Sequence, residues 1–375
     1  MKFIVSSTFL LKNLQAISGV LGSNNSLPIL DDFLFNLSGD DLKITTSDIE
    51  TTMTVSLKVT MADEPGIVAI PAKILLETLK TLPDVPVTFT IDSNTFAIEM
   101  LAGEGKYKMN GHNGEDFPET PGVDEGTEFT INSIALSEAI SKTVFAASTD
   151  EMRPVMTGVF LEMKPESTSF VATDAHKLVR YTRFDIGIEI EDSIIIPTKP
   201  LNQIKNLLGA EDQEVKVIYN RKNAFFAFGR IQLLCKLIEG KYPNYSAVIP
   251  TDNPNKLQIE RVPLLSAIRR VSIYANQSTH QLRFSLSNRS LVLSAEDMDY
   301  ANEARETLNC NYDGEDMDIG FNSKFLHEML NNLGSTEVLF EMSQPNRAGL
   351  VKPVNDEEKS NEDILMLIMP LMLND

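Results

Sequence analysis

Tryptophan is absent from this 375-residue chain, and aromatic residues of any kind make up only 7% of it. Valine, isoleucine, leucine and threonine carry most of the apolar pattern instead, which favours strands with modest helices. Cysteine is also scarce, since Cys235 and Cys310 are the only two. Two cysteines cannot build a disulfide framework or a dedicated metal cluster, so we expect reduced, buried thiols and no metal or cofactor.

Long apolar runs are missing as well. No segment reaches the roughly 18 apolar residues that a membrane helix needs. The first residues, MKFIV, lack the long apolar stretch and the small-residue cleavage site of a secretory signal. We therefore expect a cytoplasmic protein with no membrane partner. The length suits two or three domains, and contents of 42% hydrophobic and 23% charged residues are typical of globular proteins.

Motifs of known enzyme classes are not found either. The sequence has no nucleophile elbow, HExxH, P-loop or dinucleotide glycine fingerprint, and its four histidines do not stand at metal-ligand spacing. Asp174 and His176 are two residues apart, which would place them on the same face of a strand as a possible acid–base pair. A hydrogen-bonded strand histidine beside a groove is the more common situation. We therefore predict no catalytic residue and no enzymatic activity.

Positive charge is in short supply: 33 Lys and Arg stand against 53 Asp and Glu, a net charge of −20. Taken alone, this argues against nucleic acid, because neutralising phosphates needs a basic surface. Net charge is a sum, however, and a protein can be acidic outside and basic along one stripe. The distribution of Lys and Arg along the chain therefore decides.

A repeat with a period of about 125 residues organises the sequence. Its copies open with KFIVSSTFLLKNLQAIS at residues 2–18, EFTINSIALSEAISKTV at 128–144 and KLQIERVPLLSAIRRVS at 256–272. Each predicts a short alternating strand followed by an amphipathic helix.

A second strand-to-helix element recurs midway through each copy, at residues 69–83, 195–209 and 320–334. Pro near the helix start and Gly or Pro after its last apolar position are typical helix boundaries. Alternating strands separated by polar turns fill the remainder, for example around residues 41–45 and 215–219. We predict an α+β fold of three similar domains at residues 1–122, 127–250 and 255–375, with sheets on one side and helices on the other.

The recurring helices collect basic residues. Lys73, Lys199 and Lys324 occupy matching positions at three helix starts. The other basic positions on these helices are Lys12, Lys80, Lys142, Lys205, Arg269 and Arg270. Such residues are ordinarily the solvated faces of surface helices. Against the acidic background their concentration favours a basic, DNA-binding surface.

Four short segments resemble the bacterial sliding clamp family, the beta subunit of DNA polymerase III. They are SLPIL at residues 26–30, VATDAHKL at 171–178, LIEGKYPNY at 237–245 and LIMPLML at 367–373. Each alone is weak, but all four in order on a threefold repeat are specific. The resemblance implies three clamp domains, each with two helices packed on antiparallel sheets. It also implies a head-to-tail homodimer whose six domains close a ring around duplex DNA, without sequence specificity, as a polymerase processivity factor.

The resemblance also implies partners and sites. The partners are double-stranded DNA, a second copy of the chain, the DNA polymerase III alpha subunit, the clamp loader and other replication and repair proteins. The partner-peptide pocket between the second and third domains matches Met156, Thr173, Ala175, His176, Lys177, Leu178, Pro243, Val248, Ile368, Met369, Pro370, Leu371 and Met372. The dimer contact matches Lys106, Ile273, Tyr274, Glu303 and Glu306.

Several positions depart from the family pattern. Asn24 and Ala247 stand where clamps often have Arg, and Ala175 replaces a commoner Gly. The charged segment 345–363 is longer than the family pattern and is predicted to be a mobile loop. The alternative function is a repeat scaffold that binds peptides but not DNA. It would share the groove and would scatter the helix lysines over outer surfaces.

Overall fold

The structure, a computed structural model, describes residues 1–22, 27–123, 126–189, 191–209, 212–354 and 361–373. Asn24 therefore lies outside the described residues. The chain divides into two compact units. The first unit comprises Met1–Ser137 with Lys199–Leu237, and the second comprises Glu138–Thr198 with Ile238–Asp375. The division cuts through the middle repeat, so strands of that repeat belong to both units.

All six predicted strand-to-helix segments are confirmed. They are β1 (Lys2–Ser6) with α1 (Ser7–Ile17), β6 (Gly66–Pro71) with α2 (Ala72–Thr81), β11 (Thr127–Asn132) with α3 (Ser133–Thr143), β15 (Asp192–Pro197) with α4 (Thr198–Leu207), β19 (Asn255–Glu260) with α5 (Arg261–Val271), and β24 (Met317–Asn322) with α6 (Ser323–Asn331). Polar residues cap some of these helices: the Ser6 hydroxyl accepts a hydrogen bond from the Phe9 N–H, and the Asn322 side chain accepts one from the Lys324 N–H. No helix in the described part of the chain is long and apolar enough to cross a membrane.

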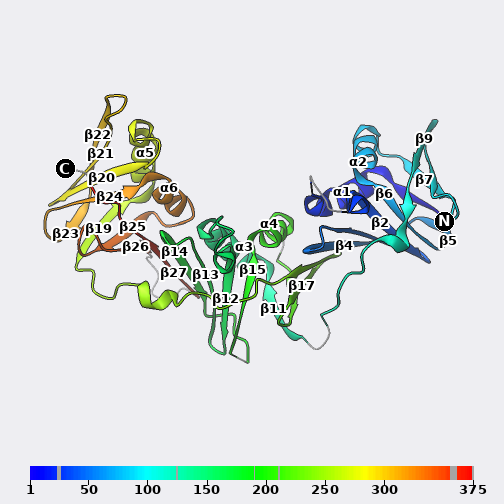
Figure 1. Cartoon of the computed structure of the whole chain (residues 1–375), viewed down its shortest axis with the longest axis horizontal. Coiled ribbons are helices and arrows are strands. Elements are labelled where there is room, and N and C mark those ends of the chain that lie inside the picture. Colours follow the sequence, from blue (N-terminus) through cyan, green and yellow to red (C-terminus); the bar gives the residue numbers. More distant parts are fainter. Residues whose placement is uncertain (23–26, 124–125, 190, 210–211, 355–360, 374–375) are drawn as a thin grey trace. The chain divides into compact units, whose positions relative to one another are not determined.

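The first unit is built on a nine-stranded antiparallel sheet in the order β10-β6-β2-β3-β4-β18-β17-β16-β11. Its remaining strands are β2 (Asp32–Ser38), β3 (Asp41–Ser47), β4 (Thr51–Lys58), β10 (His112–Asn113), β16 (Glu214–Tyr219), β17 (Asn223–Phe228) and β18 (Ile231–Lys236). Helices α1 and α2 lie side by side, α1 against β3 and β4 and α2 against β2 and β6 (Figure 1). Because β4 pairs with β18, the sheet of the first repeat continues into the second.

A smaller sheet in the order β5-β1-β7-β8-β9 completes the first unit. Its strands besides β1 are β5 (Met61–Glu64), β7 (Pro86–Ile91), β8 (Ala97–Ala102) and β9 (Gly105–Asn110). Phe3 and Phe89 from this sheet stack with centroids 4.9 Å apart, and Phe35 from the large sheet packs 6.3 Å from Phe3. All three rings are fully buried, so this aromatic group joins the two sheets.

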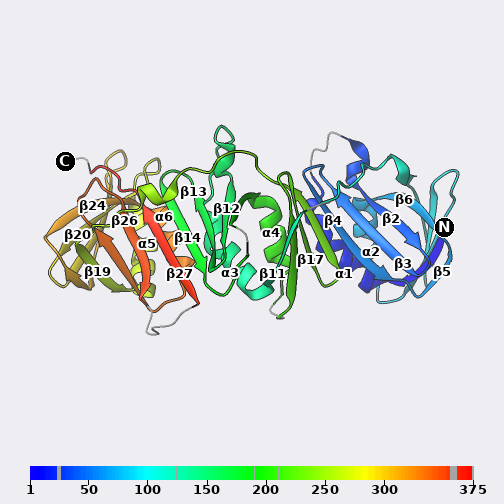
Figure 2. The ribbon, with the colours of Figure 1, turned by 90° about the horizontal axis from the view of Figure 1, so that it is seen from below.

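The second unit repeats this plan. Its nine-stranded sheet runs β15-β12-β13-β14-β27-β26-β25-β19-β23, and β22-β21-β20-β24 form a smaller one (Figure 2). The strands not yet given are β12 (Gly158–Lys164), β13 (Ser167–Thr173), β14 (Lys177–Arg183), β20 (Gln281–Ser287), β21 (Ser290–Asp297), β22 (Asn302–Asn309), β23 (Asn311–Asp313), β25 (Glu337–Met342), β26 (Gly349–Val354) and β27 (Glu362–Ile368). Phe284, Phe321 and Phe340 again join the two sheets. The β14–β27 pair carries the second repeat into the third, as β4–β18 does for the first two.

The loop predicted at residues 345–363 is wrong for most of its length. Strand β26 occupies Gly349–Val354 and pairs with β25, and β27 begins at Glu362 and pairs with β14. The charged run between them, residues 355–360, lies outside the described residues. Leu350 and Val351 are buried, so their core contacts outweigh the polar character of the segment. The thiol prediction also needs a correction, because Cys235 is buried but Cys310 is only partly so.

Two corresponding turns share an unusual backbone conformation. Ile49, between β3 and β4, has φ 75°, and Ala175, between β13 and β14, has φ 76°. Each follows an aspartate, Asp48 or Asp174, whose Oδ1 accepts hydrogen bonds from the N–H groups two and three residues later. This left-handed conformation strains residues with a Cβ, which explains why glycine suits the position of Ala175.

Replacing Ile49 by Gly should raise the free energy of unfolding by about 0.5–1 kcal/mol, because removing the Cβ relieves ~1–2 kcal/mol of strain and the more flexible unfolded chain takes part of it back. The measurement is urea unfolding followed by circular dichroism. Ile134 offers a matched control, since both side chains are 42% exposed and Ile134 lies in helix α3. The change I134G should destabilise the protein, and a loss of stability in I49G would contradict the strain argument.

Candidate functional site

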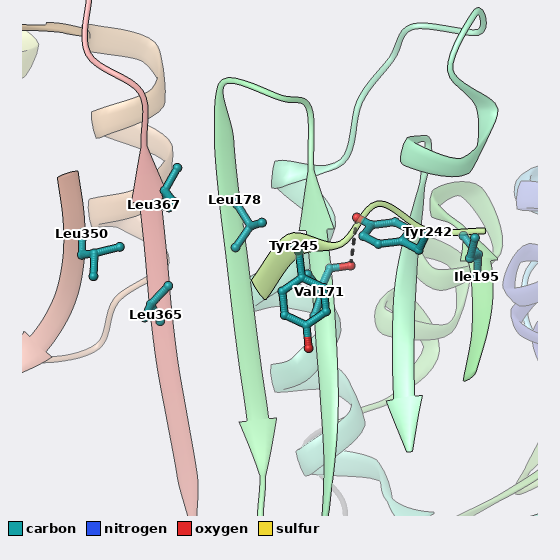
Figure 3. Packing of buried hydrophobic residues seen from close by; sticks show 8 residues of the cluster. All are labelled: Val171, Leu178, Ile195, Tyr242, Tyr245, Leu350, Leu365 and Leu367. Carbon is teal, nitrogen blue, oxygen red and sulfur yellow. Dashed lines mark hydrogen bonds between the residues drawn. The ribbon is translucent and has the colours of Figure 1, made fainter. Parts of the chain in front are cut away.

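The chain segment at residues 238–250 crosses one face of the large sheet in the second unit. Its Tyr242 and Tyr245 are buried in a cluster with Val171, Leu178, Ile195, Leu350, Leu365 and Leu367 (Figure 3). The Tyr242 ring stacks on Phe160 at 4.7 Å, and the Tyr245 hydroxyl donates a hydrogen bond of 2.7 Å to Glu162. Leu178 and Leu367 face each other across the β14–β27 pair. The cluster therefore fastens the connecting segment onto the strands that join the second and third repeats.

All of the predicted pocket residues fall in this second unit. They come from four segments: the short helix at Pro154–Met156, the β13–β14 turn, the segment at 243–248, and the end of β27 with the tail after it. Val248 is 58% exposed, Met369 39% and Met372 74%, so three large apolar side chains lie open to solvent. Met156, Thr173, Lys177, Leu178 and Ile368 are buried behind them. We call the surface of Ala175, His176, Pro243, Val248 and Met369–Met372 the tail surface.

The tail after β27 is held against a neighbouring strand. The Leu371 N–H donates a 2.8 Å hydrogen bond to the Gly320 carbonyl of β24, and the Gln281 amide donates one of 3.1 Å to the Met372 carbonyl. A cavity of about 450 Å³ opens here, lined by Arg283, Asp318, Gln344, Pro345, Asn346, Leu371, Met372 and Leu373. Only Leu371 and Met372 of this lining were predicted. The others lie on β20, β24 and the β25–β26 turn, which no spacing in the sequence connects to the tail.

The predicted strand position of Asp174 and His176 is wrong. Both lie in the turn between β13 and β14, and the Asp174 carboxylate is engaged with the N–H groups of His176 and Lys177 at 2.8 Å. His176 is exposed, and its carbonyl accepts a 2.8 Å hydrogen bond from the Met369 N–H. An aspartate that closes a turn in this way is a structural residue. The two side chains therefore do not share a strand face as an acid–base pair.

The basic helix residues divide into free and paired groups. Lys12 on α1, Lys73 and Lys80 on α2, and Lys324 on α6 are exposed, and none has a carboxylate within ion-pair distance among the described residues. Lys205 on α4 is partly exposed. Exposed cations without a partner are the ones available to a phosphate.

Four other basic residues already have polar partners. Lys199 at the start of α4 pairs with Asp48, and Arg270 pairs with Glu306 through two 2.7 Å hydrogen bonds. Arg269 donates to His327 and Asn331 on α6. The side chain of Lys142 is only 19% exposed. These four are therefore weaker candidates for phosphate contacts than the exposed lysines.

The predicted dimer contacts lie at two sheet edges. Lys106 is on β9, at the edge of the small sheet of the first unit, where it pairs with Glu99 at 2.8 Å. Glu303 and Glu306 are on β22, at the edge of the small sheet of the second unit. Ile273, 77% exposed, and Tyr274, 43% exposed, stand in a short helix beside β22. An edge strand presents unpaired backbone groups to a partner strand.

Lys142 belongs to a partly buried polar network on β14 and β27. Its Nζ lies 3.0 Å from Glu362 Oε1 and 4.5 Å from the centre of the Tyr181 ring, and the Tyr181 hydroxyl donates to Glu362. Arg183 donates to the Tyr181 oxygen at 3.2 Å. Burial alone would raise the pKa of Glu362, but the hydrogen bonds from Tyr181 and Lys142 outweigh it and hold that pKa below its usual range.

Comparison with known proteins adds a family. Models of the DNA polymerase III beta subunit match in order: the N-terminal domain at residues 1–121, the central domain at 130–244 and the C-terminal domain at 246–371. A "Beta sliding clamp" of Pseudomonas aeruginosa is 29% identical and one of Vibrio cholerae 27%, each aligned over 100% of both chains.

Solved structures agree with this similarity. The crystal structure of a sliding clamp, DNA polymerase III subunit beta, from Pseudomonas aeruginosa bound to griselimycin superposes with a TM-score of 0.93. It is 28% identical, and the match covers 100% of both chains. The α+β fold and the three-domain order therefore agree with the sequence prediction.

The network around Glu362 should make stability depend on pH. Because the folded pKa lies below the unfolded value of about 4.3, the stabilisation is complete above that value and is lost as the pH falls through the folded pKa. The change E362Q should therefore lower the free energy of unfolding at pH 7 by about 2 kcal/mol and flatten its decrease on the acid side. Urea titrations between pH 3 and 7 measure both effects. The exposed Glu166 on the same unit provides the control E166Q, and an equally steep acid limb in E362Q would contradict the assignment.

Proposed function

Because the chain belongs to the DNA polymerase III beta subunit family, we propose that it is a sliding clamp, the processivity factor that holds a polymerase on duplex DNA. Two chains close head to tail into a ring of six domains that moves along DNA in the cytoplasm without reading its sequence. The single observation that carries this proposal is the ordered match of all three domain models across the chain. We keep residues 1–122, 127–250 and 255–375 as the proposed domain boundaries.

We assign DNA contact to the helices. Lys12, Lys73, Lys80 and Lys324 are the primary phosphate contacts because they are exposed and unpaired within the described chain. Lys205, Arg269, Lys199, Arg270 and Lys142 follow, since each is less exposed or must exchange an existing partner for a phosphate. Lysines that meet phosphates neutralise charge without reading bases, which suits a protein that must slide. The net charge of −20 disfavours DNA elsewhere on the surface.

We propose that β9 of one chain meets β22 of the next in the ring. Both strands are sheet edges, β9 carries Lys106, and β22 carries Glu303 and Glu306, so the two edges complement each other in charge. Ile273 and Tyr274 supply an apolar centre. A contact between two different surfaces closes into a ring when its rotation allows.

We propose that partner proteins dock on the tail surface. Its exposed Val248, Met369 and Met372 are apolar, and methionine adapts to differently shaped ligands. The partners are the polymerase III alpha subunit, the clamp loader and other replication and repair proteins that bind clamps. Griselimycin, bound by the Pseudomonas aeruginosa clamp, is a probe for the same surface here. The chain acts by tethering, and we assign no catalytic residue.

A ring held by topology should stay on closed circular DNA and leave linear DNA. After loading by the clamp loader at moderate salt, most of the protein should co-elute with a circular plasmid in gel filtration, and cutting the plasmid once should release it. Retention that is equal on circular and linear DNA would contradict the ring. It would favour either direct gripping of the duplex or, if both values were nil, the peptide scaffold without DNA binding.

The variant K12E/K73E/K80E/K324E tests the cationic helices in the same assay. It should reduce equilibrium DNA binding and lower the slope of log affinity against log salt by about 0.9 for each phosphate contact removed. The dimer mass should be unchanged, because none of the four residues lies on β9 or β22.

The change V248D should weaken griselimycin about tenfold or more, because a carboxylate left without a partner in an apolar contact loses well over 1.4 kcal/mol of binding. Isothermal titration calorimetry on the full-length dimer measures this. Val262 on α5 is a matched control, since it is 57% exposed against 58% for Val248, and V262D should bind like the wild type. Equal weakening by both changes, or by neither, would contradict the tail surface.

A further inference from the structure

The side chain of Lys177 does not take part in the exposed wall on which its turn lies. It is only 7% exposed, and its ammonium Nζ lies 2.7 Å from Glu328 Oε2 and 3.4 Å from Asp174 Oδ2. The same Nζ stands 4.5 Å from the centre of the Phe325 ring. Glu328 and Phe325 belong to helix α6, whereas Lys177 is the first residue of β14. One buried cation therefore connects the β13–β14 turn to α6.

The turn that Lys177 holds also positions the tail. The Thr173 hydroxyl donates a 2.7 Å hydrogen bond to the Lys177 carbonyl, and Asp174 closes the turn through the N–H groups of His176 and Lys177. The His176 carbonyl then accepts the 2.8 Å hydrogen bond from the Met369 N–H. Any shift of the turn relative to α6 therefore moves Ala175, His176 and the backbone of Met369 together.

The first unit contains a corresponding latch with the charges exchanged. Its turn between β3 and β4 has the same aspartate, Asp48, and Thr51 stands where the second unit has Lys177. There the turn supplies the carboxylate, and Lys199 at the start of α4 supplies the ammonium. Each turn is thus joined to the second helix of the following repeat. In the second unit the cation comes from the turn, which leaves Lys324 of α6 without a carboxylate partner in the described chain.

We propose that Lys177 is a positioning residue for partner binding, which acts through Glu328 and Phe325 rather than by touching the partner. This rests on the proposed docking at the tail surface. A buried ammonium needs its carboxylates, and so it keeps the turn at one distance from α6. Without it the turn and Met369 are held only by the strand ladder, and the partner must order them when it binds.

Four full-length variants test this with griselimycin in calorimetry, alongside the melting temperature and dimer mass. K177M should weaken binding roughly tenfold, within the range for residues coupled through shared contacts, and E328Q should weaken it less because Asp174 still holds the ammonium. The double variant K177M/E328Q should match K177M, since both changes remove the same link. K177R should bind like the wild type, because a guanidinium can pair with Glu328 and lie over Phe325.

The contrary results are distinct. If K177M lowers the melting temperature but binds within twofold of the wild type, Lys177 is only structural and the proposal is overturned. If K177M weakens binding while E328Q does not, Lys177 contacts the ligand directly, which also overturns it. D48N breaks the latch of the first unit, keeps the oxygen that closes its turn, and should leave griselimycin binding unchanged. Docking itself is judged by V248D against V262D, so its failure is seen separately.

Discussion

Strand pairing across the repeat boundaries is the interaction on which the rest of this structure depends. At β4–β18 and at β14–β27, strands from neighbouring repeats join as closely as strands within one repeat. Each large sheet therefore belongs to two repeats at once, and no repeat boundary is left as a bare edge. The helices are held to one face of each sheet because their apolar sides pack on it. The connecting segment at 238–250 is held by Tyr242 and Tyr245. The proposed docking surface exists only because these layers meet at one junction.

Charge is distributed by the same repeat, but not evenly. Lys73, Lys199 and Lys324 occupy matching helix positions, yet Lys199 is paired with Asp48 while Lys73 and Lys324 are unpaired in the described chain. The difference comes from the turns, since the second turn supplies its own cation in Lys177 and so makes no demand on Lys324. A repeated position thus gives either a phosphate contact or an internal ion pair, depending on one residue in a different segment.

The sequence predicts the elements well and the pairings poorly, for a physical reason. Strand-to-helix segments have a period that a linear pattern records, and all six were found at the expected positions. Lys142 could not be separated from Lys73 by pattern, because its partners Tyr181 and Glu362 are distant in sequence. Asp174 and His176 were placed on a strand because their turn is tight and is bordered by strand residues on both sides. Arg283 and Gln344 meet the tail only after three sheets' worth of chain has folded.

The two junctions have the same backbone plan and different surfaces, which explains why docking is proposed at only one. In the second unit Leu178 and Leu367 face each other, and Tyr245 covers them. In the first unit the corresponding pair is Thr52 and Leu234, and the connecting segment presents Thr120. Shorter side chains leave a cavity of about 230 Å³ there, lined partly by threonine and glutamine. Threonine and glutamine keep hydrogen bonds to water that an apolar ligand would break. The apolar junction loses nothing comparable, so a hydrophobic partner segment is favoured there although both junctions arose from one repeated plan.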